Sequence, residues 1–166
     1  MKRSALIASV VSIAVLSLLI APAGAFNAAD LAKLKSTNRC INCDLDDADL
    51  SGLSLSGAEL RSSDMNRANL TGTNLSNARM DSVFANDARV SGADLNGVVL
   101  SWGVLQRANL SGANLNGAVL RHADLTGTNL ANAKVRGANW DEAILNGATW
   151  TDGSKCKEGS IGKCNK

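Results

Sequence analysis

Hydrophobic and polar positions along this chain repeat every five residues from Cys43 to Trp150. A small residue, usually Ala, comes first, an Asp or Asn follows, and a Leu stands third, before two polar or small residues. If this Leu is the central position, every fifth residue from Leu45 onward falls into one register, which gives 22 copies without a slip. The clearest copies are Ala68–Gly72, Ala93–Gly97, Ala108–Gly112, Ala113–Gly117 and Ala123–Gly127. Weaker copies replace the Leu by Met65, Met80, Val90, Val135 or Trp140, and the Ala by Ser63, Thr73, Val83 or Thr128.

A period of five fits neither a helix nor a continuous strand. Each helical residue turns about 100°, so residues five apart lie roughly 140° apart and form no apolar stripe. In a strand, successive Ala and Leu pairs would point to opposite faces. A short extended segment followed by a bend satisfies the pattern, and Gly, which suits unusual backbone angles, fills ten of the 22 positions two residues after the Leu. The sequence therefore predicts a β-solenoid of stacked coils.

These repeats resemble the pentapeptide-repeat family, whose signature is A-(D/N)-L-x-x. The resemblance covers residues 43 to 152. It implies an all-β fold, a right-handed quadrilateral β-helix with four repeats per coil, in which the central residue and the residue two before it point inward. Residues 20 apart would then lie directly above one another, and the 22 copies would form five and a half coils.

Stacking at this interval arranges the charged outward residues in columns. One column holds Asp47, Arg67, Asp87 and Arg107, and another holds Arg61, Asp81, Ser101, Arg121 and Asp141. We expect charge pairs within the columns to favour one stacking register, each contributing about 0.2–1 kcal/mol because the pairs are exposed. Anion binding by the Arg residues is the alternative interpretation.

Residues 1–25 have the features of a cleaved export signal. Lys2 and Arg3 precede an apolar stretch, and Ala23-Gly24-Ala25 matches the A-x-A cleavage pattern. A transmembrane anchor is the alternative, but the apolar stretch is about 16 residues long, shorter than the ~20 residues that span a bilayer. We therefore expect an exported protein with no stable membrane anchor after cleavage.

The mature chain that this cleavage predicts has a balanced charge. It begins at Phe26 and contains 15 basic and 15 acidic residues, because Lys2 and Arg3 leave with the signal. This balance gives no broad electrostatic reason to bind nucleic acid or an anionic membrane. Members of the quinolone-resistance type within the family resemble DNA, but the excess of 13 acidic over 8 basic residues from Asp44 to Asp152 is mild. DNA mimicry is therefore disfavoured.

Four segments follow from these patterns: residues 1–25 as signal peptide, 26–42 as N-terminal cap, 43–152 as solenoid and 153–166 as a disulfide-linked tail. Phe26 to Asn38 is expected to form a short helix, with Asn27 as N-cap and Leu31 and Leu34 on one face. We expect this helix to cover the first coil, whose open edge would otherwise invite aggregation. A partner-binding helix is the alternative. The tail otherwise has the composition of a loop.

Four Cys residues lie near the two ends of the expected rod. Cys156 and Cys164 close a short loop, and Cys40 and Cys43 form a C-x-x-C motif. We expect two structural disulfides, as suits an exported protein. A thioredoxin-like redox site at the C-x-x-C motif would need a βαβ context. A zinc site would need two further ligands, which the other Cys pair cannot supply from the far end of the rod.

The sequence contains no catalytic constellation. His122 is the sole His, its column neighbours are Trp102 and Glu142, and no motif places a nucleophile beside it. The many Asp and Asn residues recur one place before the Leu, as part of the repeat. Phosphate-loop, metal and dinucleotide motifs are absent from the sequence. We therefore expect no enzyme, cofactor or metal.

Aromatic and aliphatic residues at a few outward positions suggest an interface. Val99 and Val119 share one column, Phe84 and Val104 share another, and Trp102 lies at the corner between these two faces. A contiguous apolar cluster with a Trp often marks an interface. Alternatively, the register bulges locally, so that Phe84 replaces Ala85 inside and Trp102 lies flat over Gly103.

Trp140 and Trp150 take central positions, where we expect them to close the C-terminal end of the core, with sugar binding as the alternative.

The function that these observations favour is a non-catalytic structural or protein–protein interaction module in an exported compartment, which is periplasm, lumen or the extracellular space. Its partner is an unknown protein or a second copy, with homodimerisation as the simplest form. The alternative is a ligand-binding or enzyme-like protein with a surface site around Trp102 and His122.

Overall fold

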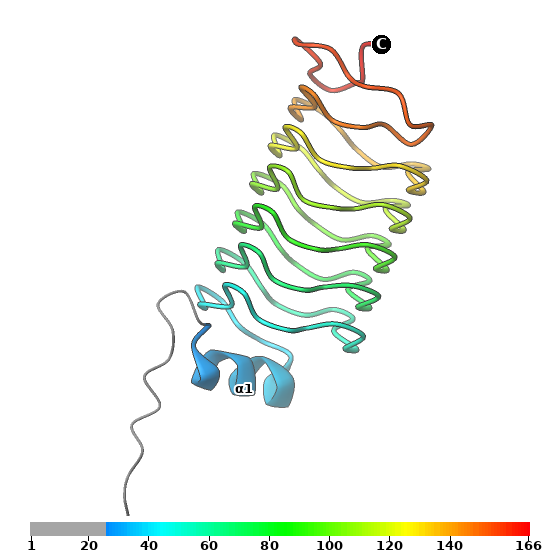
Figure 1. Cartoon of the computed structure of the whole chain (residues 1–166). Helices are drawn as coiled ribbons and strands as arrows, with labels where there is room; N and C mark the ends of the chain where they lie inside the picture. The colour runs from blue at the N-terminus through cyan, green and yellow to red at the C-terminus, as the bar shows by residue number, and fades with distance from the viewer. Residues whose placement is uncertain (1–25) are drawn as a thin grey trace, which may run out of the picture.

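The computed structural model describes residues 26–166, and the expected signal peptide lies outside the described residues. These residues form a rod of stacked coils, with helix α1 at the N-terminal end and the C-terminal tail at the opposite end (Figure 1). Within this range no helix is both long and apolar enough to cross a membrane.

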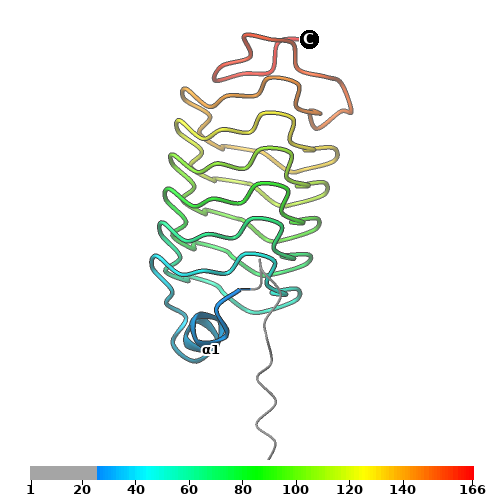
Figure 2. The same cartoon turned by 60° about the vertical axis from the view of Figure 1, so that its left-hand side comes forward.

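Helix α1 spans Ala28–Thr37 and lies beside the first coil (Figure 2). The Asn27 side chain accepts a hydrogen bond from the backbone N–H of Ala29 at 2.9 Å, so Asn27 is the N-cap. Asn38, in the left-handed conformation, ends the helix. The helix is therefore slightly shorter than expected, because the residues near its expected ends serve as caps. Leu34 is fully buried, which joins the helix to the solenoid core.

The coils stack with a repeat of 20 residues. Nineteen parallel bridges join residues 20 apart, from Arg39 with Glu59 to Asn129 with Thr149. Each face contributes a single bridged residue. Residues 26–166 therefore contain isolated bridges and no strand of two or more residues. The family resemblance implied four repeats per coil, and the interval of the bridges equals four repeats of five.

A tight turn forms each corner. In the first one, the Ala48 N–H donates to the Leu45 carbonyl at 3.1 Å. The third turn residue has a positive φ at all 21 corners from Asp47 to Gly147, between 56° and 70°. A positive φ at this turn position alone is the signature of a type II turn. This conformation explains why Gly recurs two residues after the Leu, since an L side chain is strained there.

The core consists of the two inward positions of each repeat. The central Leu side chains from Leu45 to Leu130 are buried, and so are most of the small residues two places earlier. Where a hydroxyl residue replaces the Ala, its hydroxyl donates to a backbone carbonyl of the coil below: Thr73 to Leu50 at 2.7 Å and Thr128 to Leu105 at 2.9 Å. These bonds satisfy buried polar groups that would otherwise be costly.

The tail is more ordered than its loop-like composition suggested. It reverses direction after Trp150 and runs antiparallel over two faces of the last coil, with bridges from Lys155 to Thr149 and from Ile161 to Ile144. Sequence analysis missed this arrangement because two isolated antiparallel contacts leave no periodic pattern. Trp140 and Trp150 pack edge to face below the tail, with ring centroids 5.3 Å apart.

Charge pairs form in one expected column and only partly in the other. Arg67 binds Asp47, and Arg107 binds Asp87, each through two hydrogen bonds of 2.7 and 2.9 Å. The hydrogen bond from Arg67 lowers the pKa of Asp47. In the second column Arg121 pairs with Asp141 at 3.8 Å.

The expected pairing of Arg61 with Asp81 is wrong. Arg61 pairs instead with Glu59 at 2.9 Å, and Arg79 lies 4.0 Å from Asp81. Each of these Arg residues finds a carboxylate two residues away along its own coil, and this local partner is preferred to the residue in the next coil.

The four Cys residues form two disulfides, Cys40–Cys43 and Cys156–Cys164, and no free Cys remains among the described residues. Thiol titration of the denatured, unreduced mature protein should therefore detect no free thiol. Titration after reduction supplies the control and should detect four. Two or more free thiols in the unreduced protein would contradict the disulfide assignment.

Candidate interaction surface

The apolar patch, by which we mean Phe84, Val99, Trp102, Val104 and Val119, lies on two adjacent faces of the rod and the corner between them. The backbone bridges pair Phe84 with Val104 and Val99 with Val119, so each pair occupies neighbouring coils on one face. Trp102 is the third residue of the turn that joins the two faces, with a φ of 62°. The patch thus gathers residues from four repeats, two on each side of one corner.

Phe84 and Trp102 point outward. Their exposed fractions are 46% and 62%, whereas Ala85 is buried at 1%. The register therefore does not bulge to place Phe84 inside. The inward position at Gly103 is tightly enclosed, since a Cβ there would lie 3.0 Å from the Leu100 carbonyl oxygen and 3.2 Å from the Leu105 side chain. Phe84 and Trp102 therefore present large apolar side chains at outward positions.

The indole of Trp102 stacks on the imidazole of His122. Their ring centroids are 4.0 Å apart and the planes differ by 15°. Both residues occupy the third turn position of successive coils, and both have a positive φ that directs the side chain away from the core. This stack covers one face of the indole, while Trp102 as a whole stays 62% exposed.

No catalytic arrangement surrounds this stack in the described part of the chain. His122 makes a ring contact with Trp102, and within residues 26–166 its side chain has no hydrogen bond to a Ser or Cys. The neighbouring charged pair, Arg121 with Asp141, is exposed. The geometry provides an aromatic and aliphatic contact surface.

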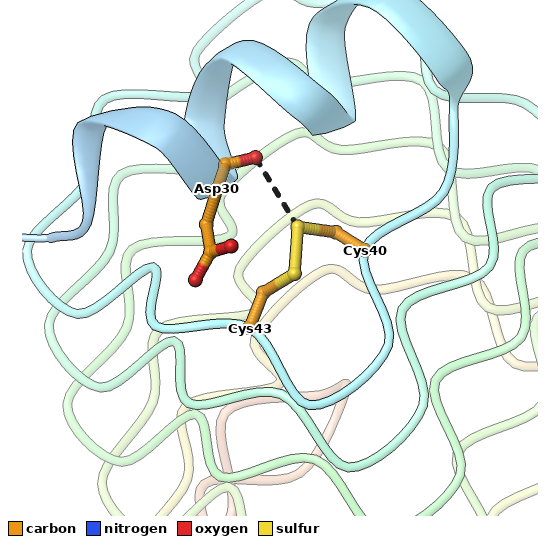
Figure 3. A group of neighbouring side chains, drawn as sticks. All are labelled: Asp30, Cys40 and Cys43. Atoms are coloured by element: carbon orange, nitrogen blue, oxygen red, sulfur yellow. Dashed lines mark hydrogen bonds between the residues drawn. A yellow bond between two sulfur atoms is a disulfide. The ribbon is translucent and has the colours of Figure 1, made fainter.

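The C-x-x-C motif lies below α1, where Cys40 and Cys43 are both buried (Figure 3). The Cys40 sulfur lies 3.2 Å from the backbone oxygen of Asp30, and the Asp30 carboxylate is near both sulfurs. Because the two sulfurs are bonded to each other, they are not thiolate ligands in this structure. The buried Ser63 hydroxyl donates to the Cys40 carbonyl at 2.6 Å and accepts from the Cys43 N–H at 3.1 Å. The motif therefore fastens the cap to the first coils.

Ile161 is a further exposed apolar residue that lies outside the apolar patch and that the repeat pattern does not predict. Ile161 of the tail is 53% exposed and is bridged to Ile144, which belongs to the same face as Phe84 and Val104. Asp124 interrupts this face between Val104 and Ile144. Only the antiparallel return of the tail brings Ile161 here, so no repeat position pointed to it.

The family profile described as Pentapeptide repeats matches the chain in overlapping segments between residues 43 and 149, with eight copies. The chain belongs to the pentapeptide-repeat family. This match confirms the resemblance that was predicted from the A-(D/N)-L-x-x pattern. A comparison with curated protein sequences gives no significant match.

Solved structures of other pentapeptide-repeat proteins have the same architecture. The crystal structure of Rfr23 from the cyanobacterium Cyanothece 51142 shares 24% identity with a TM-score of 0.65, covering 74% of this chain and 97% of that one. A trypsin-treated R167E form of QnrB1, a plasmid-mediated fluoroquinolone resistance protein, shares 25% identity with a TM-score of 0.55, covering 66% of this chain and 61% of that one. The first likeness shows the fold alone. This pentapeptide-repeat protein therefore shares its stacked-coil repeat fold with these proteins.

Proposed function

We propose that this pentapeptide-repeat protein is a non-catalytic protein–protein interaction module of an exported, oxidising compartment, and that the apolar patch is its contact surface. The observation that carries the proposal is the ordered exposure of Trp102 and Phe84 within one contiguous cluster. Large aromatic side chains at the centre of an interface supply much of the binding energy. We also take the coil to be right-handed, as the family resemblance implies.

Two disulfides support the compartment part of the proposal. Disulfides persist in oxidising compartments such as the periplasm, a lumen or the extracellular space and are rare in the cytosol. The signal-like residues 1–25 point to the same destination. Cleavage after Ala25 and export to one of these compartments remain part of the proposal.

A second copy is the occupant that we favour for the patch. The faces of the rod that carry Val99, Val119, Phe84 and Val104 are formed by regular bridges, so two rods can lie side by side along them. A two-fold contact would bring each Trp102 against the aliphatic residues of the other copy. A site for a ligand around Trp102 and His122 is the second candidate, favoured by the exposed face of their stack.

The double variant Trp102→Ser with Val119→Asn tests the patch. It should shift the mature protein from dimer to monomer in sedimentation or light scattering. The melting temperature should hardly change, because surface substitutions usually alter stability by no more than about 0.5 kcal/mol. Asn132→Ser is a matched control, since Asn132 occupies the same turn position on an exposed corner, with a φ of 60°.

Two results would argue against this proposal. The first is a wild-type protein that stays monomeric at high micromolar concentration. The second is a double variant that unfolds, because the patch would then be packing that the solenoid requires.

A further inference from the structure

The last coil of the rod is only half covered. In every lower coil, the N–H of the central residue donates to the coil above, as Leu115 does to Lys134 and Leu120 to Asn139. The tail supplies such partners for two faces, where Leu145 donates to Ser160 and Trp150 donates to Ser154. The other two faces, which together span residues 133–142, receive no backbone hydrogen bond from the tail, although Gly162 lies close to their Trp140–Glu142 end.

Six backbone groups on these two faces have no hydrogen-bond partner among the described residues. They are the N–H groups of Val135, Gly137, Trp140 and Glu142, and the carbonyl oxygens of Ala133 and Ala138. Every equivalent group one coil below is bonded, for example the Gly117 N–H to Arg136 at 2.9 Å. We call residues 133–142 the open edge. An unpaired row of this kind is a template on which another chain can add a strand.

The inward side chains of the open edge are also partly exposed to solvent. Val135, Ala138 and Trp140 occupy inward positions and are half-buried, whereas Leu115 and Leu120 directly below them are 0% exposed. A chain laid along the edge would therefore bury apolar surface in addition to pairing backbone groups. The inward positions of that chain must be small or aliphatic to fit.

The C-terminal disulfide keeps the edge uncovered. After Ile161 the tail continues to Gly162, whose N–H donates to the Ala143 carbonyl, next to the Glu142 end of the open edge. A Cβ at Gly162 would already lie 3.6 Å from the Trp140 carbonyl oxygen, so the tail reaches this end of the edge without pairing along it. From there Cys164 turns back to bond Cys156, and the Asn165 carbonyl accepts from the Lys157 N–H. The tail thus stays at the end of the rod, where it pairs with the faces of Ile144 and Thr149 (Figure 1).

The charges beside the open edge indicate what kind of chain fits. Lys134 and Arg136 are exposed on its first face, and neither has a carboxylate partner in the described residues. In the rod itself, stacked opposite charges form double hydrogen bonds at the turn position, as with Arg67 and Asp47. At the position of Arg136, directly after the central residue, Arg121 lies 3.8 Å from Asp141 in the next coil. Acidic side chains stacked above Lys134 and Arg136 would bring carboxylates within a similar distance of these two unpaired charges.

We propose that the open edge at residues 133–142 binds an extended acidic peptide segment of a partner protein by strand addition. The segment places small or aliphatic side chains over Ala133, Val135 and Ala138, and carboxylates over Lys134 and Arg136. This site is separate from the apolar patch and does not depend on it. A second copy fits less well, because its own tail or its helix α1 would have to share the space above the two covered faces.

A designed peptide tests the proposal with the mature protein. The peptide is Ala-Asp-Leu-Asp-Gly-Ala-Asn-Leu, acetylated at its N-terminus and amidated at its C-terminus. It follows the A-(D/N)-L-x-x pattern and places its two Asp residues over Lys134 and Arg136. In the free protein, the backbone amides of Val135 and Trp140 should exchange quickly with deuterium, while those of Leu115 and Leu120 are protected. Adding the peptide should slow exchange at Val135, Gly137 and Trp140 and shift their amide resonances.

Charge reversal supplies the specificity test. The variant Lys134→Glu with Arg136→Glu should bind the acidic peptide at least about tenfold more weakly, since two exposed ion pairs become repulsions. It should also bind the Lys version, Ala-Lys-Leu-Lys-Gly-Ala-Asn-Leu, better than the wild type does. Lys157→Glu with Lys163→Glu is the control, because it changes the net charge of the same end by an equal amount without touching the open edge.

Three outcomes would overturn the proposal. One is equal binding of the acidic and Lys peptides by the wild type. Another is resonance shifts confined to residues outside the open edge. The third is a dimer whose Val135 and Trp140 amides are already protected without peptide, which would assign the edge to a second copy. The Trp102→Ser with Val119→Asn variant should bind the peptide like the wild type. A negative result for the apolar patch would therefore not count against the open edge, and the reverse also holds.

Discussion

Leu110→Asp is expected to abolish folding of the mature protein. Leu110 is 0% exposed and lies at the central position of a middle coil, so its replacement buries a carboxylate with no partner. We expect a loss of more than about 4 kcal/mol in the free energy of unfolding, comparable to or larger than the margin of many domains. Because each coil of a solenoid is stabilised by its neighbours, failure in the middle should propagate to both ends.

Circular dichroism and urea unfolding measure this effect. Ser111→Asp is the matched control, since it places the same carboxylate one residue later, at an outward position next to the turn. Leu110→Met, which keeps the position apolar, should remain folded with a loss below about 1.5 kcal/mol. Equal losses in Leu110→Asp and Ser111→Asp would show that the inward assignment is wrong.

Ending the mature chain at Thr151 is expected to be the second most damaging change. The deletion removes six backbone hydrogen bonds from the last coil, one each at Ala143, Leu145, Gly147 and Ala148 and two at Trp150. It also uncovers Leu145 and Ala148, which are both 0% exposed. At about 0.5–1.5 kcal/mol for each hydrogen bond, together with the lost burial, we expect a destabilisation of about 5 kcal/mol.

The truncated protein should also associate, because all four faces of its last coil then present unpaired backbone groups. Thermal unfolding and size-exclusion chromatography would detect both effects. The full-length variant Cys156→Ala with Cys164→Ala keeps the residues of the tail and loses only the covalent link, so it should cost no more than about 3 kcal/mol. A truncated chain that is monomeric and melts with the wild type would contradict the role of the tail as a cap.

The two proposed surfaces would bind through different interactions, one through side-chain contacts and the other through backbone hydrogen bonds. The apolar patch offers side chains on the flank of the rod, where the N–H and carbonyl groups of its four face residues (Phe84, Val99, Val104 and Val119) are already bonded between coils. The open edge offers backbone groups at the end of the rod, where the coils stop. A repeat protein can therefore bind one partner along its side and another at its end, provided that each surface is exposed.

The repeat pattern by itself determined most of the coil. The spacing of Leu and Ala predicts which side chains are inward, and Leu45 through Leu130 are buried as expected. The position of Gly two residues after the Leu predicts the corner, and every one of those corners has a positive φ. Asn27 and Leu34 predict the cap helix. These features are predictable because each depends on a backbone conformation that recurs with the same five-residue period.

The tertiary structure alone decided the ends and the surface contacts. Arg61 pairs with Glu59 and not with Asp81, and Trp102 stacks on His122, because side chains on a regular surface select among several neighbours at similar distances. The tail runs antiparallel over Ile144 and Thr149, and it leaves Val135 and Trp140 without partners. Beyond Trp150 the period is lost, so pairing there depends on which backbone groups remain free once the coils have formed. That is a property of the folded rod, and no single stretch of sequence contains it.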